Sequence, residues 1–517
     1  MVRPFDRSKV EISESLGMER GIPKVEAPFN IALIGNFGGS AQAAQTKAGI
    51  ANRRMILVDR DNLDEVLSRV APTVSLPMEG SEALVPRFRG LEDFHPDRLL
   101  ENVDLFRRLR EVRRRLSDPA TFPAAAEELG LSAKPQRSTP ASNATASAES
   151  VVAAVTRDRG GSLLDDVLQQ SEAPAPARGS SRPDELQEFV QRVTRPHLVP
   201  DVDDRQAAAL QVIDRALSAQ MRALLHTPTF QALEAAWRAV YFLVRRVETS
   251  EQLKLYLIDI SQEELCRDVL SSPDPGKTQT YRLLVEKTVG TAGAERLALI
   301  VGNYTFGPTR DDAEALGRMA KIAHAAEAPF LAAASPTLLG CASLAETPHP
   351  RDWKTPLEAE AAKAWDALRR SPDAAWIGLA LPRFLLRLPY GKDTDAIESF
   401  DFEEMPGERP HEDYLWSNPA FACALLLAQS FSDDGWEMRP GTHSEINGLP
   451  LHVYKHNGES ELKPCAEALL TEGAAERILD NGLMPLVSLK GQDAVRVVRF
   501  QSMAEPLRGV AGRWGRS

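Results

Sequence analysis

The chain has 517 residues, 43% of them hydrophobic and 26% charged, which is enough apolar material for two or three folded domains. Its net charge of −12 argues against a protein that coats nucleic acid or an anionic membrane. The four cysteines form no Cys-x-x-Cys pair, so we expect isolated buried thiols in a reducing cytoplasm. The sequence shows neither a signal peptide nor an apolar run of membrane-spanning length, and we expect a cytoplasmic protein without direct membrane insertion.

The first 28 residues are polar and interrupted by prolines, and we interpret them as an N-terminal arm. A short alternating run at 9–13 predicts a strand in which Val10 and Ile12 share one side. A tethered strand of this kind can pair with the sheet edge of a neighbouring subunit, because backbone hydrogen bonds supply the affinity.

An apolar run at 29–34 predicts a buried strand that leads into a glycine-rich turn at 35–40. The turn lacks the spacing and the Lys-Ser/Thr ending of phosphate-binding loops, so we favour a tight turn over a nucleotide site. Residues 53–58 predict a second strand, and an acidic run from Asp59 opens a helix. These acids break the calcium-loop pattern, since Val70 occupies its twelfth position, and they are well placed to oppose the positive end of the helix dipole.

Pro96 predicts the first turn of a long helix. Its apolar face consists of four residues at helical spacing, Leu99, Val103, Phe106 and Leu109. The opposite face carries six arginines, Arg107, Arg108, Arg110, Arg113, Arg114 and Arg115. Acids interrupt this row and no aromatic residues are interleaved with it, so we favour a solvated or subunit-contacting face over nucleic-acid binding.

No aromatic residue occurs between Pro123 and Phe189, and residues 132–160 are rich in Ala, Ser and Thr. This composition predicts a disordered linker over 132–188. Within it, 162–170 predicts a short amphipathic helix whose apolar stripe consists of Leu163, Leu164, Val167 and Leu168. A short helix between disordered flanks is marginal alone, so it either docks into a groove of a partner or forms only transiently.

Helices and buried strands alternate from residue 203 onwards. A periodic helix opens at Pro228 with Trp237 on its apolar stripe, a helix follows Ser261, and strands are predicted at 253–260, 298–306 and 329–335. This alternation predicts an α/β fold with mixed sheets covered by helices. A run at 275–278 ends like a phosphate loop, but Ser271 replaces the first glycine of that motif, so we reject the site.

Two arginines, Arg383 and Arg387, lie four residues apart in an apolar segment bounded by prolines. Proline removes a backbone donor and restricts the preceding residue, so this segment is not a plain helix. We expect each guanidinium to be paired with carboxylates or carbonyls, with Glu403 and Glu404 as possible partners. No nucleophile, base or ligand-like histidine spacing accompanies the arginines, so we favour a structural role and expect no metal, cofactor or catalytic residue.

A long motif surrounds these arginines. It consists of Trp-x-x-x-Arg-x-Ser-x-Asp from Trp365, Leu-Pro-Arg-Phe-Leu-Leu-Arg-Leu-Pro-Tyr-Gly at 381–391 and Tyr-Leu-Trp-Ser-Asn around Trp416. The order and content resemble the large subunit of the type VI secretion contractile sheath, with Trp365, Arg383, Arg387 and Trp416 in its structural core. In that family an N-terminal Leu-Leu-Asp helix is recognised by the ClpV disassembly ATPase, which implies that role for the helix at 162–170.

Three earlier motifs, at 59–67, 91–99 and 116–119, resemble the small sheath subunit of the same machine. The chain is thus similar to both halves of a heterodimer, small before large. We assign the chain to four segments: an arm at 1–28, a small-subunit-like domain at 29–131, the linker at 132–188 and a large-subunit-like domain at 189–517.

The resemblance implies a structural protein rather than an enzyme. It predicts a fused protomer that assembles with other sheath subunits around the inner tube protein, contracts against a baseplate and is recycled by a ClpV-type ATPase. The family's large subunit continues beyond the position of Phe500 with a helical segment and strands that interlace neighbours, whereas this sequence ends at Ser517. The alternative is therefore an accessory cap or a baseplate or distal-end adaptor that does not polymerise by itself.

Overall fold

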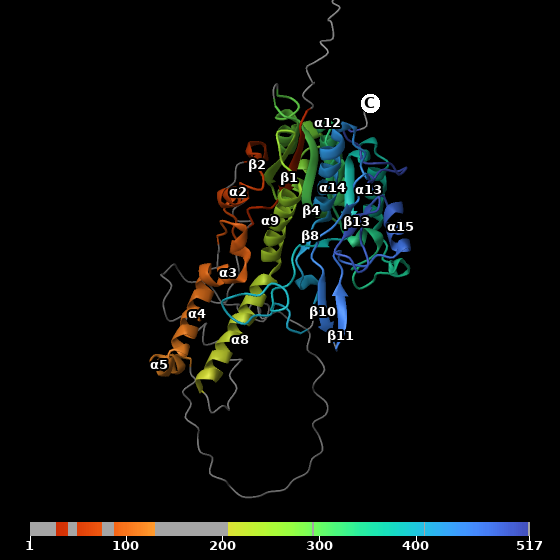
Figure 1. Cartoon of the computed structure of the whole chain (residues 1–517). Helices are drawn as coiled ribbons and strands as arrows, with labels where there is room; N and C mark the ends of the chain where they lie inside the picture. Colours follow the sequence, from red (N-terminus) through yellow and green to blue (C-terminus); the bar gives the residue numbers. More distant parts are fainter. Residues whose placement is uncertain are drawn as a thin grey trace, which may run out of the picture.

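A nine-stranded sheet organises the protein, with the strand order β2-β3-β1-β4-β5-β6-β12-β13-β9 (Figure 1). The computed structural model describes residues 27–39, 49–74, 87–129, 205–291, 294–407, 409–456 and 458–514. The strands of this sheet are β1 (Phe29–Gly35), β2 (Ile56–Val58), β3 (Leu253–Asp259), β4 (Leu297–Phe306), β5 (Phe330–Ala334), β6 (Ile377–Leu381), β9 (Glu445–Ile446), β12 (Met484–Ser488) and β13 (Val495–Val497). The strands from β3 to β12 run parallel and those at the margins antiparallel, which confirms the predicted mixed α/β class.

Strand β1 lies in the interior of this sheet, although it comes from the small-subunit-like part of the chain. Leu33 is opposite Leu257 of β3 on one side and Val301 of β4 on the other. All seven residues of β1 are buried, as expected for a parallel strand covered on both faces. The small-subunit-like and large-subunit-like parts therefore share one sheet.

Helices cover both faces of the sheet and bury two separate clusters of apolar side chains. The cluster that contains Leu33 also contains Trp237 and Leu425, from helices α9 (Pro228–Arg246) and α14 (Pro419–Asp434). The cluster on the other face contains Ile34 and is covered by α10 (Gln262–Leu270), α12 (Arg310–Ala326), α13 (Ala359–Arg369) and α15 (Glu472–Asp480). Alternate residues of β1 thus contribute to the two clusters on opposite faces of the sheet.

Local signals set the helix starts that the sequence predicted. Pro228 occupies the first turn of α9, where the missing N–H costs nothing. Ser261 caps α10, because its hydroxyl accepts a hydrogen bond from the Glu264 N–H and the Glu264 side chain accepts one from the Ser261 N–H.

The prediction of one long helix from Pro96 is wrong, because the helix is interrupted after its first two turns. The structure has two helices, α3 (Pro96–Asn102) and α4 (Asp104–Ser117), because Val103 between them is extended with φ −92° and ψ 123°. The apolar spacing runs without interruption through this break, so the sequence pattern alone gave no sign of it. Val103 itself is buried, and the turn of the chain there allows both helices to bury their apolar faces.

Helix α4 packs against α8 (Arg205–Leu225), and α5 (Phe122–Glu128) follows it. Figure 1 shows these helices extending away from the sheet. The Arg113 guanidinium joins α4 to α8 through Asp214, with Nε 2.6 Å from the carboxylate.

The described part of the chain also contains shorter elements, among them helices α2 (Leu63–Val70) and α11 (Gln279–Tyr281), and strands β7 (Phe384–Leu385), β8 (Trp416–Ser417), β10 (His452–His456) and β11 (Glu459–Lys463). Among the described residues, no helix is long and apolar enough to cross a membrane. The predicted arm strand, the linker and the helix at 162–170 lie outside the described residues.

Candidate functional site

The segment at 382–391 connects the end of β6 with the loops below the sheet, and it contains the short strand β7. Strand β7 pairs with β8, with Phe384 opposite Ser417 and Leu385 opposite Trp416. Phe384 and Leu385 are completely buried. The segment is therefore an extended chain wedged between other elements, as the flanking prolines predicted.

Arg387 is buried in a cage of acceptors. Its Nε lies 2.8 Å from Glu234 of α9, and its Nη1 lies 2.8 Å from Glu404 and 3.1 Å from the Leu388 carbonyl oxygen. The guanidinium also stands 4.2 Å above the ring of Tyr390. Fork-shaped pairing of this kind needs arginine, because lysine carries a single point charge.

A second arginine balances the charges around this cage. Glu234 also accepts a hydrogen bond from Nε of Arg238 at 2.6 Å, and Nη2 of Arg238 donates to the Tyr390 hydroxyl at 3.0 Å. On the other side, the Glu404 carboxylate lies 3.3 Å from Nε2 of His226. We name Arg387, Glu234, Glu404 and Arg238 the buried arginine cage.

Burial and charge act in opposite directions on these groups. Burial alone would raise the pKa of Glu404, but the charge of Arg387 and hydrogen bonds from His226, Arg387 and the Tyr390 N–H outweigh it and lower the pKa to about 2. Burial disfavours the charged form of Arg387, yet Glu234 and Glu404 raise its pKa well above the usual value. Glu404 and Arg387 are thus both charged near neutral pH.

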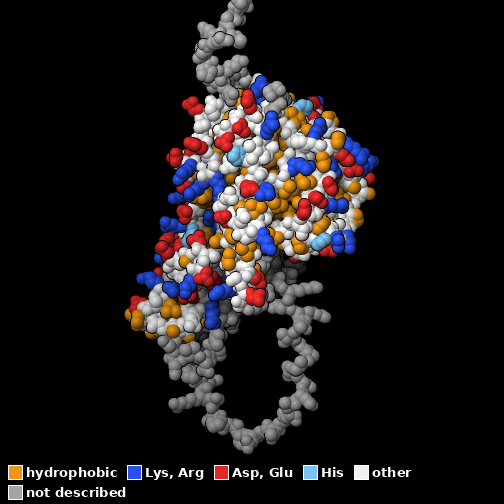
Figure 2. Space-filling model, turned by 45° about the vertical axis from the view of Figure 1, so that its right-hand side comes forward, with side chains coloured by type: hydrophobic (Ala, Val, Ile, Leu, Met, Phe, Trp, Pro, Cys, Tyr) orange, Lys and Arg blue, Asp and Glu red, His pale blue; other side chains and the backbone are white. Residues whose placement is uncertain are grey.

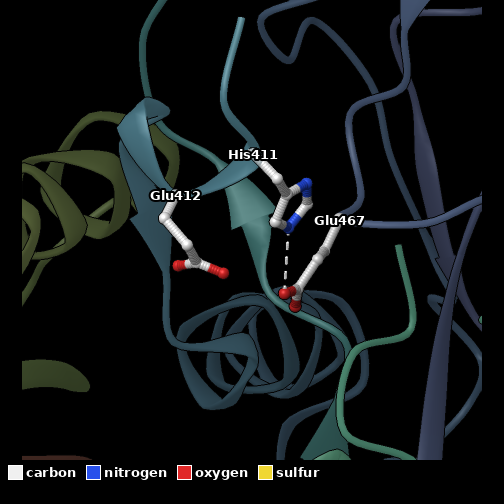
Figure 3. Close-up of side chains that lie close together, drawn as sticks. All are labelled: His411, Glu412 and Glu467. Atoms are coloured by element: carbon white, nitrogen blue, oxygen red, sulfur yellow. Dashed lines mark hydrogen bonds and ion pairs between the residues drawn. The ribbon is translucent and has the colours of Figure 1, made fainter. Parts of the chain in front are cut away.

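Arg383 forms a separate network closer to the surface. Its Nη2 lies 3.0 Å from Glu412 and 2.5 Å from Glu467, and Nε2 of His411 is 3.1 Å from Glu467 (Figure 3). Burial would raise the pKa of Glu467, but hydrogen bonds from His411 and Arg383 and the charge of Arg383 lower it to about 2.

His411, Glu412 and Glu467 bring three ligand atoms within 4.8 Å of one another, a spacing that suits a metal ion. The guanidinium of Arg383 already contacts both carboxylates, and Nζ of Lys463 donates to Nδ1 of His411 at 2.8 Å. The imidazole and both carboxylates are thus already engaged by basic side chains, so the arrangement is an ion-pair network.

The structure brings together only some of the residues that the sequence singled out. Glu404 is a partner of Arg387, as predicted, but Glu403 is not, because its carboxylate accepts from the Lys392 N–H at 3.0 Å. Trp416 lies beside Arg383, with 5.9 Å between guanidinium and ring.

Trp365 is buried in the cluster on the opposite face of the sheet, away from the buried arginine cage. Sequence reasoning missed Glu234 and Glu467, which are 153 and 84 residues from the arginines that they contact. No local motif marks either acid.

The glycine-rich turn at 35–40, which the sequence did not favour as a nucleotide site, has another role in the structure. In the glycine-rich turn, the Gly38 N–H donates to the Asp259 carboxylate at 2.9 Å, and the Asn36 side chain accepts from the Gly39 N–H at 3.1 Å. A carboxylate therefore occupies the place where a phosphate would need this amide.

The arginine-rich face of α4 is largely paired, with Asp104, Glu111, Asp214 and Glu128 as partners. Figure 2 shows acidic and basic side chains interspersed over the face that it draws, without the single-sign surface that nucleic-acid binding requires.

The apolar stripe at 163–168 and the strand residues Val10 and Ile12 lie outside the described residues and stay predictions. The four cysteines are free thiols, and three of them are buried.

Comparison with known proteins adds the family. The sequence model of VipB, described as "EvpB/VC_A0108, tail sheath N-terminal domain", matches residues 207–504, more than half of the chain. The model described as "Type VI secretion system, VipA, VC_A0107 or Hcp2" matches residues 4–125. The two matches follow one another in the order that the sequence motifs predicted.

Two relatives from Pseudomonas aeruginosa agree with these matches. The type VI secretion system sheath protein TssC1 is 37% identical over 303 residues, which cover 57% of this chain and 61% of TssC1. The sheath protein TssB1 is 28% identical over 120 residues, which cover 22% of this chain and 69% of TssB1. The matched part of the chain thus spans about three fifths of the length of TssC1. The chain belongs to the VipB tail sheath family and is a type VI secretion sheath protein in which a TssB-like segment is fused to a TssC-like segment.

Proposed function

We propose that this chain is a fused protomer of a contractile sheath, with the TssB-like and TssC-like parts held at a ratio of one to one. The observation that carries the proposal is the position of β1. This strand of the TssB-like part pairs with β3 and β4 of the TssC-like part over most of its length. Fusion keeps together two parts that build one sheet between them.

The proposed role is mechanical rather than catalytic. The relatives are sheath proteins, and the carboxylates around Arg383 and Arg387 are engaged in ion pairs within the fold. In our proposal, protomers assemble around an inner tube protein and contract against a baseplate, and the energy resides in the difference between two packings of rigid subunits. The ion pairs of the buried arginine cage would keep each subunit rigid during that change.

Two parts of the chain outside the described residues complete the proposal. The stripe of Leu163, Leu164, Val167 and Leu168 would serve as the handle for a ClpV-type ATPase that disassembles the contracted sheath, and the arm residues Val10 and Ile12 would pair with a neighbouring subunit. A pull-down with the ATPase tests the handle. Leu164→Asp should abolish binding, Gln169→Asp should retain it, and equal binding by both variants would contradict the assignment.

Negative-stain electron microscopy of the purified chain tests the proposed function. A fused protomer should form tubules from a single purified polypeptide, without added subunits. Monomers that bind only to the ends of tubules made from a separate TssB–TssC pair would contradict it and identify an accessory cap or adaptor. Monomers that bind no tubule would exclude both roles.

A further inference from the structure

The hairpin of β10 and β11 carries an exposed apolar pair. Val453 of β10 is directly opposite Leu462 of β11, and these side chains are 58% and 38% exposed. The opposite face of the hairpin is attached to the body, since Nδ1 of His452 lies 2.9 Å from the Tyr414 hydroxyl. The apolar pair therefore faces away from the protein's own core, where it costs solubility unless something covers it.

Strand β2 offers a second exposed feature at one margin of the nine-stranded sheet. It pairs with β3 on one side only, so its outer edge has no strand partner among the described residues. Leu57 in the middle of β2 is 45% exposed. Exposed Arg54 and Arg60 flank the strand, and neither forms an ion pair with a described residue.

The two features are complementary in both apolar content and charge. Strand β11 carries exposed Glu459 and Glu461, which lie on the opposite face of the strand from Leu462. An antiparallel register with Leu57 opposite Leu462 also brings Arg60, in the turn that follows β2, towards the end of β11 that carries Glu459. Residues opposite each other share a face of the sheet, so the leucines meet on one face, and the opposite charges of Arg60 and Glu459 come near each other at the end of the paired strands.

The contact cannot form within one copy, because Figure 1 shows β2 and the hairpin well apart on the molecule. We infer that β11 of one copy adds to the free edge of β2 in a second copy, with Leu57 packed against Leu462 and Val453 next to Leu462 on the same face. This inference rests on the proposed function, since it supplies one contact of a polymerising subunit.

The contact joins two different surfaces, so it is heterologous and propagates from copy to copy. A helical sheath requires such a contact, whereas a contact between identical surfaces would close into a dimer. One added strand buries less than the roughly 1,200 Å² of a stable interface, so the contact acts together with others in the assembly.

Cysteine crosslinking tests the inference on the full chain. Leu57→Cys chains are mixed with Leu462→Cys chains, assembled and oxidised. We expect a disulfide-linked dimer in the mixture that is at least tenfold more abundant than with either variant alone. The matched control replaces Leu57→Cys by Val498→Cys, which is 42% exposed at another site and should give only background.

Charge reversal gives an independent readout. Arg60→Glu and Glu459→Arg should each slow assembly several-fold, and the double variant should restore it, because both side chains are exposed and the fold does not depend on them. Unchanged thermal unfolding midpoints would verify that the single variants are folded.

Assembly without the crosslink, or a crosslink between two Leu462→Cys chains alone, would overturn the inference and leave the proposed function intact. Wild-type chains that do not associate at all would contradict both.

Discussion

Arg387 shows how a buried charge is kept at the centre of this fold. Two carboxylates from distant parts of the chain, Glu234 and Glu404, satisfy its guanidinium, and all three side chains are almost inaccessible to solvent. A buried ion pair adds little net stability compared with a well-packed apolar cluster, but removal of Arg387 leaves Glu404 without an arginine partner and Glu234 with Arg238 alone. The contribution of Arg387 to stability is therefore seen mainly in the free energy that its removal costs.

Replacement of Arg387 by Met should destabilise the protein by about 3–5 kcal/mol, because buried Glu404 loses its arginine partner and buried Glu234 keeps only Arg238. Urea denaturation monitored by tryptophan fluorescence measures the change. The control Arg98→Met removes a solvent-exposed pair with Glu101 and should shift the midpoint only slightly. Equal shifts for the two variants would contradict the role of the buried arginine cage.

The lowered pKa of Glu467 predicts that the stability of the folded protein decreases at acidic pH. Its pKa is about 2 in the folded protein and about 4.5 when unperturbed, so its contribution is complete above pH 4.5 and is lost as the pH falls towards 2. Glu467→Gln should lower the thermal midpoint at pH 7 and flatten its decline between pH 4.5 and 2. A variant whose curve runs parallel to the wild type throughout that range would refute the assignment.

At this scale the sequence predicted half of the site. Arg387 and Glu404 were identifiable because they lie 17 residues apart in one unusual segment. Glu234 was not, because nothing in an amphipathic helix shows which of its acids faces a segment 153 residues away. Glu403 and Glu404 were equally possible partners for the same reason, because neighbouring acids in a loop cannot be distinguished until the path of the backbone is known.

The strands and helices themselves were more predictable than their contacts. Continuous apolar runs predicted β1, β4 and β5, and caps at Ser261 and Pro228 predicted two helix starts. The break at Val103 was missed, because a helical spacing of apolar residues persists across it. The order of the strands in the sheet could not be predicted from the sequence, because β1 pairs with strands more than 200 residues further along the chain.

Gly302 in β4 gives a prediction for the sheet. A Cβ atom at this position would lie 2.5 Å from the Phe330 ring and 2.8 Å from the Tyr304 ring, so Gly302→Ala should cost about 1–3 kcal/mol through overpacking. Gly407→Ala is the control, because no atom lies within 4 Å of its added methyl group. Thermal unfolding compares the two, and a neutral Gly302→Ala variant would show that β4 and β5 are less tightly packed than described.

For the whole molecule, the shared sheet makes the TssB-like and TssC-like parts one folding unit. β1 contributes side chains to the core on both faces, so its removal would open a gap between β3 and β4 and expose Leu257 and Val301. The two parts should therefore unfold in a single transition, and neither should be stable without the other.

Cleavage between the two parts tests this central claim most directly. A protease site is placed within residues 132–160, and the cut protein is analysed by size-exclusion chromatography under native conditions. The account predicts that both pieces co-elute as a one-to-one complex, and that Leu33→Asp in β1, but not the exposed Leu507→Asp, causes them to separate after the cut. Pieces of the wild-type chain that separate in native buffer would contradict a shared sheet.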